Sequence, residues 1–268
     1  MTQLPPLTEA EKAIPYSKYY VAAELLSPEE ESHIRVQMKP EYAIHFEQFL
    51  DGFSTDPRPE ADNRFYMFPA GTGFADMMVE LKYCTVEMIT WWFRWMNYPP
   101  KGIPEECGNL RYKIWDPMNH WDTRFCVEEM AGRVTESFDD GQGDPRWVSK
   151  MHPQTPEMIG LRTKQIEALK AQGAAFSCTV NSTAGMADRI SVSVHQPKPE
   201  GGVITRARYW FGCTIRDGKP ERDMRINQYS LETVRKILRH NIIEKRRMDA
   251  FLPSLYAEYG NKPMECDD

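Results

Sequence analysis

A histidine and a glutamate stand four residues apart near the end of the chain, in the segment His240-Asn-Ile-Ile-Glu244. On a helix this spacing places both side chains on one face, one turn apart, so that an imidazole and a carboxylate can reach the same metal ion. The simpler interpretation is a surface histidine beside an acid, in a stretch rich in Arg and Lys. A metal site therefore requires further ligands from elsewhere in the chain.

Candidate ligands stand in the middle of the chain. His120 follows a proline turn at the end of a predicted strand, where polar side chains often point into a pocket; the simpler interpretation is a loop histidine in solvent. Glu136 shares one face of a predicted strand with two apolar residues, and a carboxylate buried there needs a cation nearby. Glu128 and Glu129 are alternatives to it. Two histidines and two carboxylates suit zinc, or less selectively manganese or iron.

Three further side chains could transfer protons. His195 ends one predicted strand, and Tyr209 lies in the next, beyond a Gly-Gly turn. If these strands pair as a hairpin, we expect the two side chains opposite each other on one face, as general acid–base partners. The alternative is a polar pair on the outer face. Arg206 and Arg208 lie on the face opposite Tyr209 and belong in solvent or in a salt bridge, and Tyr112 is a third candidate near His120.

The elements that must position these residues follow a definite order. Apolar side chains recur at helical spacing over residues 75–97, and a double proline ends the run. The apolar face of this predicted helix is wide enough to suggest contact with a second subunit. Residues 50–73 are a predicted loop. Strands are predicted at residues 109–115, 132–138, 175–180, 189–195 and 203–215, and helices at 27–36, at 155–171 and from Ser230 to about Pro253, which is expected to end or kink the last helix.

This order predicts an α+β protein in two parts. Residues 1–104 form a mainly helical N-terminal region. Residues 105–268 form a curved antiparallel sheet wrapped around the long C-terminal helix. The helix closes the concave face of such a sheet into a cavity, which suits an apolar or aromatic ligand of medium size.

Composition narrows the class of protein. The 268 residues carry a net charge of −6, with 41% hydrophobic and 27% charged residues, as in soluble globular proteins rather than disordered chains. The acidic balance makes binding to nucleic acid or to an anionic membrane unexpected, and no apolar run approaches the roughly 20 residues of a membrane span. The six cysteines are scattered and no secretory signal is recognised, so we expect a cytoplasmic protein with reduced thiols.

The order and spacing of the motifs resemble those of the diacetylphloroglucinol hydrolase family, over about residues 75–255. The motifs are Glu87-Met-Ile-Thr-Trp-Trp-Phe, Tyr112-Lys-Ile-Trp-x-Pro-x-x-His120, Arg-Val-Thr-Glu136, Val-His195, Arg-x-Arg-Tyr209-Trp-x-Gly and His240-x3-Glu244. The resemblance implies a zinc-dependent hydrolase that cleaves the carbon–carbon bond between an aryl ring and an acyl group. The expected substrate is a small aromatic ketone, such as an acylphloroglucinol or a dihydrochalcone.

The same resemblance implies a fold and a set of roles. The fold is a helix-grip (Bet v 1-like) catalytic domain, with the helical N-terminal region in the contacts of a homodimer. Tyr112, His195 and Tyr209 fall on substrate-contact and acid–base positions. The implied zinc ligands are His120, Glu136, His240 and Glu244.

Two departures from the family pattern bear on these roles. The gap between His120 and the next carboxylate is shorter than in the family, which bears on Glu136 as a ligand. Thr123 stands where some relatives have an asparagine, which bears on the contacts of the acyl group. Two other functions remain open: a non-catalytic helix-grip protein that binds an aromatic or lipid ligand without metal, and a zinc ester or amide hydrolase.

Overall fold

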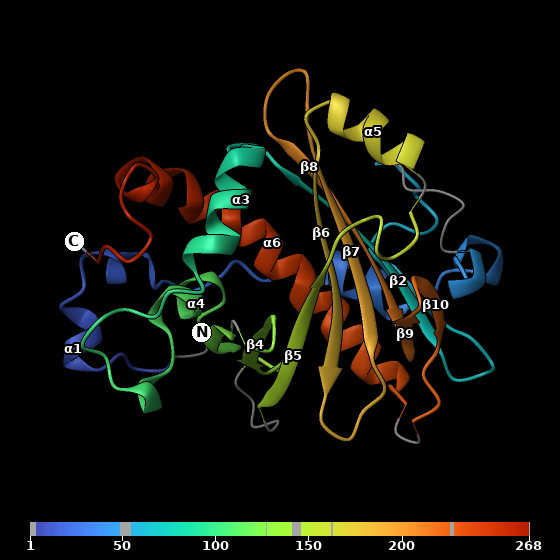
Figure 1. The fold of residues 1–268 in the computed structure, drawn as a ribbon, viewed down its shortest axis with the longest axis horizontal. Helices are drawn as coiled ribbons and strands as arrows, with labels where there is room; N and C mark the ends of the chain where they lie inside the picture. Colours follow the sequence, from blue (N-terminus) through green and yellow to red (C-terminus); the bar gives the residue numbers. More distant parts are fainter. Residues whose placement is uncertain are drawn as a thin grey trace.

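The structure is a computed structural model, and it describes residues 4–48, 55–126, 128–140, 146–161, 163–225 and 228–267 (Figure 1). The helices are α1 (Glu9–Lys12), α2 (Pro28–Arg35), α3 (Val86–Trp95), α4 (Leu110–Trp115), α5 (Thr163–Ala171) and α6 (Leu231–Tyr259), with 3-10 turns η1 (Pro15–Tyr19), η2 (Pro40–Tyr42), η3 (Phe46–Gln48) and η4 (Glu105–Cys107). The strands are β1 (Arg64–Met67), β2 (Gly73–Leu81), β3 (His120–Cys126), β4 (Ala131–Glu136), β5 (Trp147–Gln154), β6 (Ala175–Thr183), β7 (Arg189–Pro197), β8 (Val203–Phe211), β9 (Cys213–Arg216) and β10 (Lys219–Arg222).

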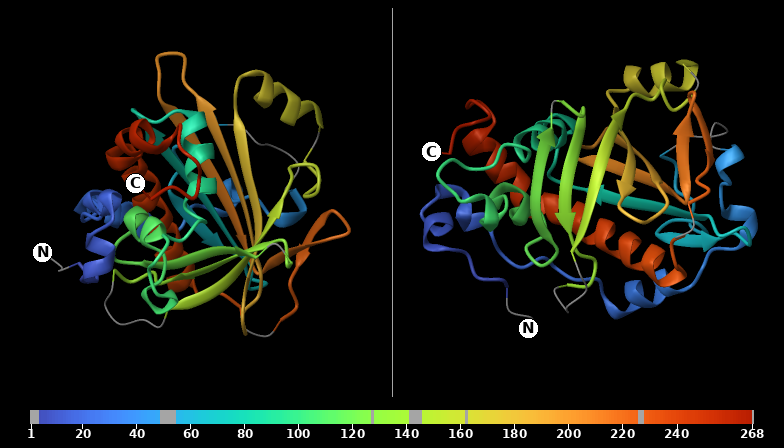
Figure 2. Two further views of the ribbon diagram at one scale, coloured as in Figure 1. Left: turned by 60° about the vertical axis from the view of Figure 1, so that its left-hand side comes forward. Right: turned by 60° about the horizontal axis from the view of Figure 1, so that its bottom comes forward.

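One large antiparallel sheet organises the described residues. Its eight strands lie in the order β1-β2-β8-β7-β6-β5-β4-β3, and β9 and β10 form a separate hairpin. The strands from β3 to β8 follow one another as neighbours, whereas β2 reaches the sheet from the N-terminal part of the chain and pairs with β8. The sheet is strongly curved, so that β4 and β5 run across the direction of β7 and β8 (Figure 2). The predicted curved antiparallel sheet is therefore present.

The long helix α6 lies along the inner face of this sheet (Figures 1 and 2). Ser230 caps it, because its side chain accepts a hydrogen bond of 3.0 Å from the backbone of Thr233. The apolar stripe of α6 packs with α3, α4 and the inward side chains of β2 and β8 in one buried cluster. A second cluster lies on the outer face, under α5, residues 38–46 and Ala61. The sheet is thus covered on both faces.

Several predicted elements agree with the structure. The predicted strands over 132–138, 175–180, 189–195 and 203–215 correspond to β4, β6, β7 and β8 with β9; α5 lies within its predicted helix, and α6 begins where a helix was predicted. Ser27 begins α2 with a capping box that includes Glu30. On the outer face, Arg208 donates from Nε to Asp76 at 3.2 Å, and Arg206 pairs with the same buried carboxylate, so the predicted salt bridge is confirmed.

Other predictions are wrong. Residues 73–81 form strand β2 rather than the first half of a helix, because a strand buried on both faces has the same unbroken apolar run as a buried helix; Thr85 then caps the shorter helix α3. Residues 110–115 form helix α4 rather than a strand. The predicted loop over 50–73 contains β1, and its residues 50–54 lie outside the described residues. α6 continues through Pro253 rather than ending there.

The N-terminal part is therefore only partly helical, since β1 and β2 belong to the large sheet. The division of the chain at residue 104 stays a prediction. All six cysteines lie within the described residues and are free thiols. No helix in the described part of the chain has both the length and the apolar composition to cross a membrane.

Candidate metal centre and its cavity

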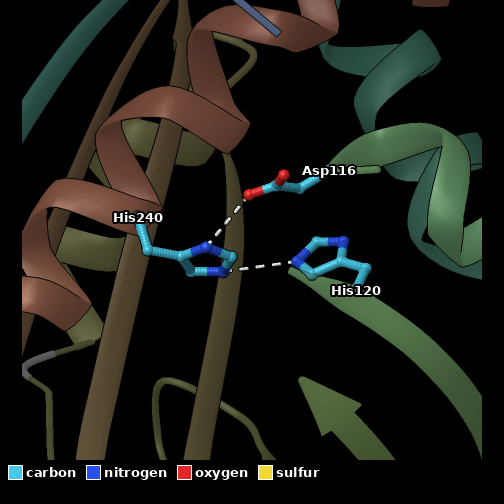
Figure 3. Close-up of side chains that lie close together, drawn as sticks. All are labelled: Asp116, His120 and His240. Atoms are coloured by element: carbon cyan, nitrogen blue, oxygen red, sulfur yellow. Dashed lines mark hydrogen bonds and ion pairs between the residues drawn. The ribbon is translucent and has the colours of Figure 1, made fainter. Parts of the chain in front are cut away.

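Two elements carry the histidines of the candidate centre. His120 is the first residue of β3, and its backbone N–H donates to Asp116 at the end of α4 over 2.8 Å. His240 lies in the middle of α6. The two rings approach each other edge to face, and the carboxylate of Asp116 points at the ring of His240 (Figure 3). The tight connection between α4 and β3 thus directs His120 at α6.

Four side-chain atoms converge at this point. The Nε2 atoms of His120 and His240 are 3.3 Å apart. Oε2 of Glu244 lies 3.3 Å from the first and 3.5 Å from the second, and Oε2 of Glu136 lies 3.8 Å from both. Ligand atoms about 2.0–2.2 Å from a tetrahedral zinc lie roughly 3.3–3.6 Å from one another. The four residues named as ligands by the resemblance therefore lie together and are buried; the two imidazoles and Glu244 have the spacing of one tetrahedral ion, and Glu136 lies slightly farther out.

Partners on the far side of each group fix this arrangement. Nδ1 of His120 lies 3.2 Å from the carbonyl oxygen of Tyr112, and Nδ1 of His240 lies 3.1 Å from Oδ2 of Asp116. The carbonyl oxygen of Tyr112 accepts from Nδ1 of His120, which leaves the Nε2 lone pair of His120 facing His240, while the charge of Asp116 lies beside the ring of His240. The hydroxyl of Tyr112 donates to Oε2 of Glu136 at 2.7 Å. The donor set thus fits a cation at its centre.

Asp116 was not predicted from the sequence. With His120 and His240 it forms a group of three that could hold a metal by itself. We do not count it among the four ligands, because its carboxylate lies at Nδ1 of His240, whereas the atom of His240 that faces the other ligands is Nε2. The only sequence signal was its place in the proline turn before His120.

Electrostatics at the centre favour positive charge. Burial by itself would lower the pKa of His240, but Asp116 and Glu244 outweigh burial and raise it to about 9. Burial would raise the pKa of Glu244, yet Lys245 and the imidazoles bring it down to about 2. The carboxylates around His240 cause the first shift, and the cations around Glu244 cause the second. An ion bound there would displace the proton of His240.

A cavity of about 340 Å³ opens beside the centre, between α6 and the sheet. Glu136, His240 and Glu244 lie on its wall. Its aromatic lining is Phe93, Tyr112, Trp115, Phe125, Phe176 and Tyr209, and its polar lining on β6 and β7 is Ser177, Thr179, Asn181, Arg189, Ser191 and Ser193. This volume is at the lower end of the range of about 300–1,000 Å³ for small-molecule sites.

Comparison with known proteins identifies the family. The family described as the DAPG hydrolase PhiG domain matches residues 50–257. The chain belongs to this family.

Three relatives of known name share this similarity. Phloretin hydrolase of Eubacterium ramulus is 24% identical over 278 residues, which cover 93% of this chain and 92% of the relative. A 2,4-diacetylphloroglucinol hydrolase of Pseudomonas sp is 26% identical over 203 residues, with 66% of this chain and 64% of the relative covered. That of Pseudomonas protegens is 26% identical over 204 residues, with shares of 66% and 62%.

In this member of the DAPG hydrolase family, two phenols reach the cavity beside the centre. Burial raises the pKa of Tyr112 and of Tyr209 well above the ordinary value, with smaller contributions from nearby carboxylates. Both hydroxyls therefore stay protonated at neutral pH. That of Tyr209 donates to Oδ1 of Asn241 at 2.8 Å, beside His240 on α6.

His195 lies elsewhere than expected. The hairpin register sets it opposite Thr205 and sets Tyr209 opposite Ser191, so the predicted pairing of His195 with Tyr209 is wrong. The reason is a tight turn between Pro197 and Val203, centred earlier than that pairing requires. His195 is not among the residues lining the cavity; its ring lies 6.0 Å from that of Phe93, which does line it.

The chemical state of His195 is also defined. Its Nδ1 is 2.9 Å from the hydroxyl of Thr205. Burial, with a smaller contribution from Lys245, lowers the pKa of His195 to about 3, so the imidazole is neutral at neutral pH. A catalytic role for His195 stays a prediction.

The alternatives to Glu136 lie at the surface. Glu129 is exposed and pairs with Lys150 at 2.8 Å, and Glu128 is also exposed. Thr123 is buried and donates to Oδ1 of Asn97, which lines the cavity, at 3.1 Å. The chain thus presents an amide to the cavity from Asn97, just after the end of α3, rather than from β3.

Proposed function

We propose that this protein is a zinc-dependent hydrolase that cleaves the carbon–carbon bond between an acyl group and a polyhydroxylated aromatic ring. The observation that carries the proposal is the convergence of four ligand atoms beside an aromatic cavity, three of them from residues on its wall. Membership of the DAPG hydrolase family and the names of the relatives supply the class of reaction and substrate. We further propose that the fold is of the helix-grip (Bet v 1-like) type, because a curved antiparallel sheet encloses α6.

The reaction is chemically a hydrolysis of a β-diketone. A phloroglucinol-type ring tautomerises to a ketone, so the ring carbon that bears the acyl group becomes tetrahedral. Attack of water on the acyl carbonyl then breaks the bond to that carbon. The acyl group leaves as a carboxylic acid, and the ring carbon takes the electron pair and a proton. The ring therefore has to be held in a pocket that also supplies a proton.

The ligands in this proposal are Nε2 of His120, Nε2 of His240 and one oxygen each of Glu136 and Glu244. A zinc ion held there supplies Lewis-acid polarisation of the acyl carbonyl. The residues of the chain do the rest. Tyr112 holds Glu136 in place by its hydrogen bond.

Proton donors and a cation lie on the same wall. The hydroxyls of Tyr112 and Tyr209 are the proposed donors to the ring, because both line the cavity and both stay protonated. The ammonium of Lys245, 3.0 Å from Oε1 of Glu244, lies 4.1 Å from the ring centre of Trp115 and offsets negative charge on the substrate. We also propose an acid–base role for His195, which binds no metal and lies next to Phe93 rather than on the cavity wall.

The experiment that tests the function is metal analysis combined with product analysis. Purified protein should contain about one zinc per chain and convert acylphloroglucinols or dihydrochalcones into a carboxylic acid and the free ring. His240→Ala should lose zinc and activity together, whereas His152→Ala, on β5 and away from the cavity wall, should keep both. Protein without any transition metal, and without activation by added zinc, would favour a non-catalytic binder. Turnover of esters or amides alone would favour the other hydrolase.

A further inference from the structure

Two polar residues on the sheet side of the cavity are left with unused hydrogen-bonding atoms. Asn181 of β6 and Arg189 of β7 are direct partners in the register of these antiparallel strands, so their side chains stand on one face. Both line the cavity. Neither has a part in the metal centre or in the proton donors proposed above.

The amide of Asn181 is only 3% exposed. Its Nδ2 donates to the hydroxyl oxygens of Ser191 at 2.9 Å and Thr179 at 3.2 Å, which uses both of its N–H groups. Its Oδ1 is buried and accepts no hydrogen bond from any described residue. A buried acceptor left without a donor costs about 1–3 kcal/mol. A ligand hydroxyl would remove that cost.

Arg189 offers the complementary atom. Its Nε–H is buried and, within the described part of the chain, finds no acceptor. The guanidinium lies over the rings of Tyr209 and Phe211, at 5.9 and 5.8 Å from their centres. These ring contacts place the cation at the cavity wall and leave its Nε–H without an acceptor among the described residues.

We propose that Asn181 and Arg189 form a subsite for a second hydroxyl group on the substrate, remote from the bond that is broken. The hydroxyl oxygen accepts from Nε–H of Arg189 while its proton is donated to Oδ1 of Asn181. The subsite lies on β6 and β7, whereas the metal ligands on the cavity wall come from β4 and α6. Tyr209 connects the two, because its ring contacts Arg189 and its hydroxyl donates to Asn241 of α6. This inference rests on the proposed function and narrows its substrate to one with a hydroxyl group that reaches the sheet wall while its acyl group lies at the metal ligands.

The test compares two ligand pairs that differ only in that hydroxyl. The first pair is a dihydrochalcone with a phloroglucinol ring and either a 4-hydroxyphenyl or a phenyl group at the end of the acyl chain. The second pair replaces the ketone by a methylene group, so it cannot be hydrolysed and its binding is measured by calorimetry. A hydrogen bond to a charged group contributes about 1.5–3 kcal/mol, so we expect the hydroxylated member to have about 10–100-fold higher kcat/KM and affinity.

Variants assign this preference to the two residues. Arg189→Met keeps an unbranched side chain against Tyr209 and Phe211 but removes the donor, and Asn181→Leu removes the acceptor at similar size. Each should reduce the preference for the hydroxylated ligand about tenfold, with Arg189→Lys in between. Arg133→Met, on the exposed side of β4, is the matched control and should leave preference and rate unchanged. Thermal unfolding of each variant verifies that it folds.

The outcomes separate the subsite from the function. Hydrolysis without any preference for the hydroxyl would overturn the subsite and leave the proposed function standing. A preference in binding without hydrolysis would support the subsite and refute the function. A third ligand with a carboxylate in place of the 4-hydroxyl should bind more weakly, because it offers Asn181 no proton; tighter binding would overturn the assignment to a hydroxyl.

Discussion

At the scale of single residues, the decisive feature is the pair of imidazole nitrogens 3.3 Å apart. The Nε2 lone pair of His120 faces His240 beside two buried carboxylates, and positive charge at this point, a proton on His240 or a metal ion in its place, balances them. Residue types and their spacing indicated His240 with Glu244, and the resemblance completed the set. The sequence analysis missed three residues of the site, Asp116, Lys245 and Asn241. Each of them contacts a ligand or a proton donor, and such supporting residues follow no recognisable spacing in the sequence.

Asp116 gives the first prediction at this scale. Asp116→Asn keeps the size of the side chain but removes the charge that holds Nδ1 of His240. We expect about 10–100-fold weaker zinc binding, the usual cost of losing such an outer partner, measured by competition with a chromophoric chelator. Asp217→Asn, in an exposed turn, is the control. Unchanged affinity in Asp116→Asn would mean that the carboxylate is itself dispensable.

His195 gives a prediction for the dependence of stability on pH. Its pKa is about 3 when folded, below the ordinary value of about 6.5 in the unfolded chain. The stability it contributes is therefore present above pH 6.5 and is lost as the pH falls from 6.5 toward 3. Between pH 7 and pH 5 the loss is about 2 kcal/mol at most. His195→Leu should show a correspondingly smaller decrease in the free energy of urea unfolding; an equal decrease would place His195 in a more solvated site.

At the scale of elements, two helices and one hairpin turn set the geometry of the site. α4 was read as a strand because all six of its residues are buried, which leaves no polar face to reveal helical spacing. β2 was predicted as a helix for a similar reason. It is buried on both faces, so its sequence shows no alternation of apolar and polar residues. The predicted register of the hairpin between β7 and β8 was wrong because its turn is centred earlier in the sequence than predicted. The two glycines alone do not determine where a turn is centred. α6 was predicted well because it has an N-cap and an amphipathic face.

The cap of α6 provides the prediction for an element. Ser230→Ala removes the hydrogen bond to the backbone of Thr233 and should lower the free energy of unfolding by about 1 kcal/mol. Ser230→Asp keeps an acceptor and should restore most of it. Zinc affinity of both folded variants should equal that of the wild type, because the ligands lie turns away from the cap. A change in affinity would show that the helix end and the centre are coupled.

At the scale of the whole molecule, the sheet is closed by contacts that are distant in sequence. β2 pairs with β8, so residues 73–81 lie beside residues 203–211, and no local pattern could have shown this. The apolar run that suggested a dimer is divided between β2 and α3, and Trp91, Trp92 and Trp95 of α3 are buried within the single chain. The homodimer and the cytoplasmic location stay predictions.

An interface would now have to use other side chains of the N-terminal region. Val21 and Leu25 are 52% and 53% exposed, side by side in the segment between η1 and α2. We expect sedimentation at micromolar concentration to give twice the chain mass of 31.2 kDa, and Leu25→Glu to shift it toward the single chain. A species of 31.2 kDa in the wild type would refute the dimer.

The central claim is that His120, Glu136, His240 and Glu244 hold one zinc ion. X-ray absorption at the zinc edge, on protein loaded with one equivalent of zinc, tests it most directly. We expect four nitrogen and oxygen neighbours at about 2.0–2.2 Å, two of them imidazoles, and no sulfur. A sulfur neighbour, a single imidazole or no bound zinc at all would contradict the account.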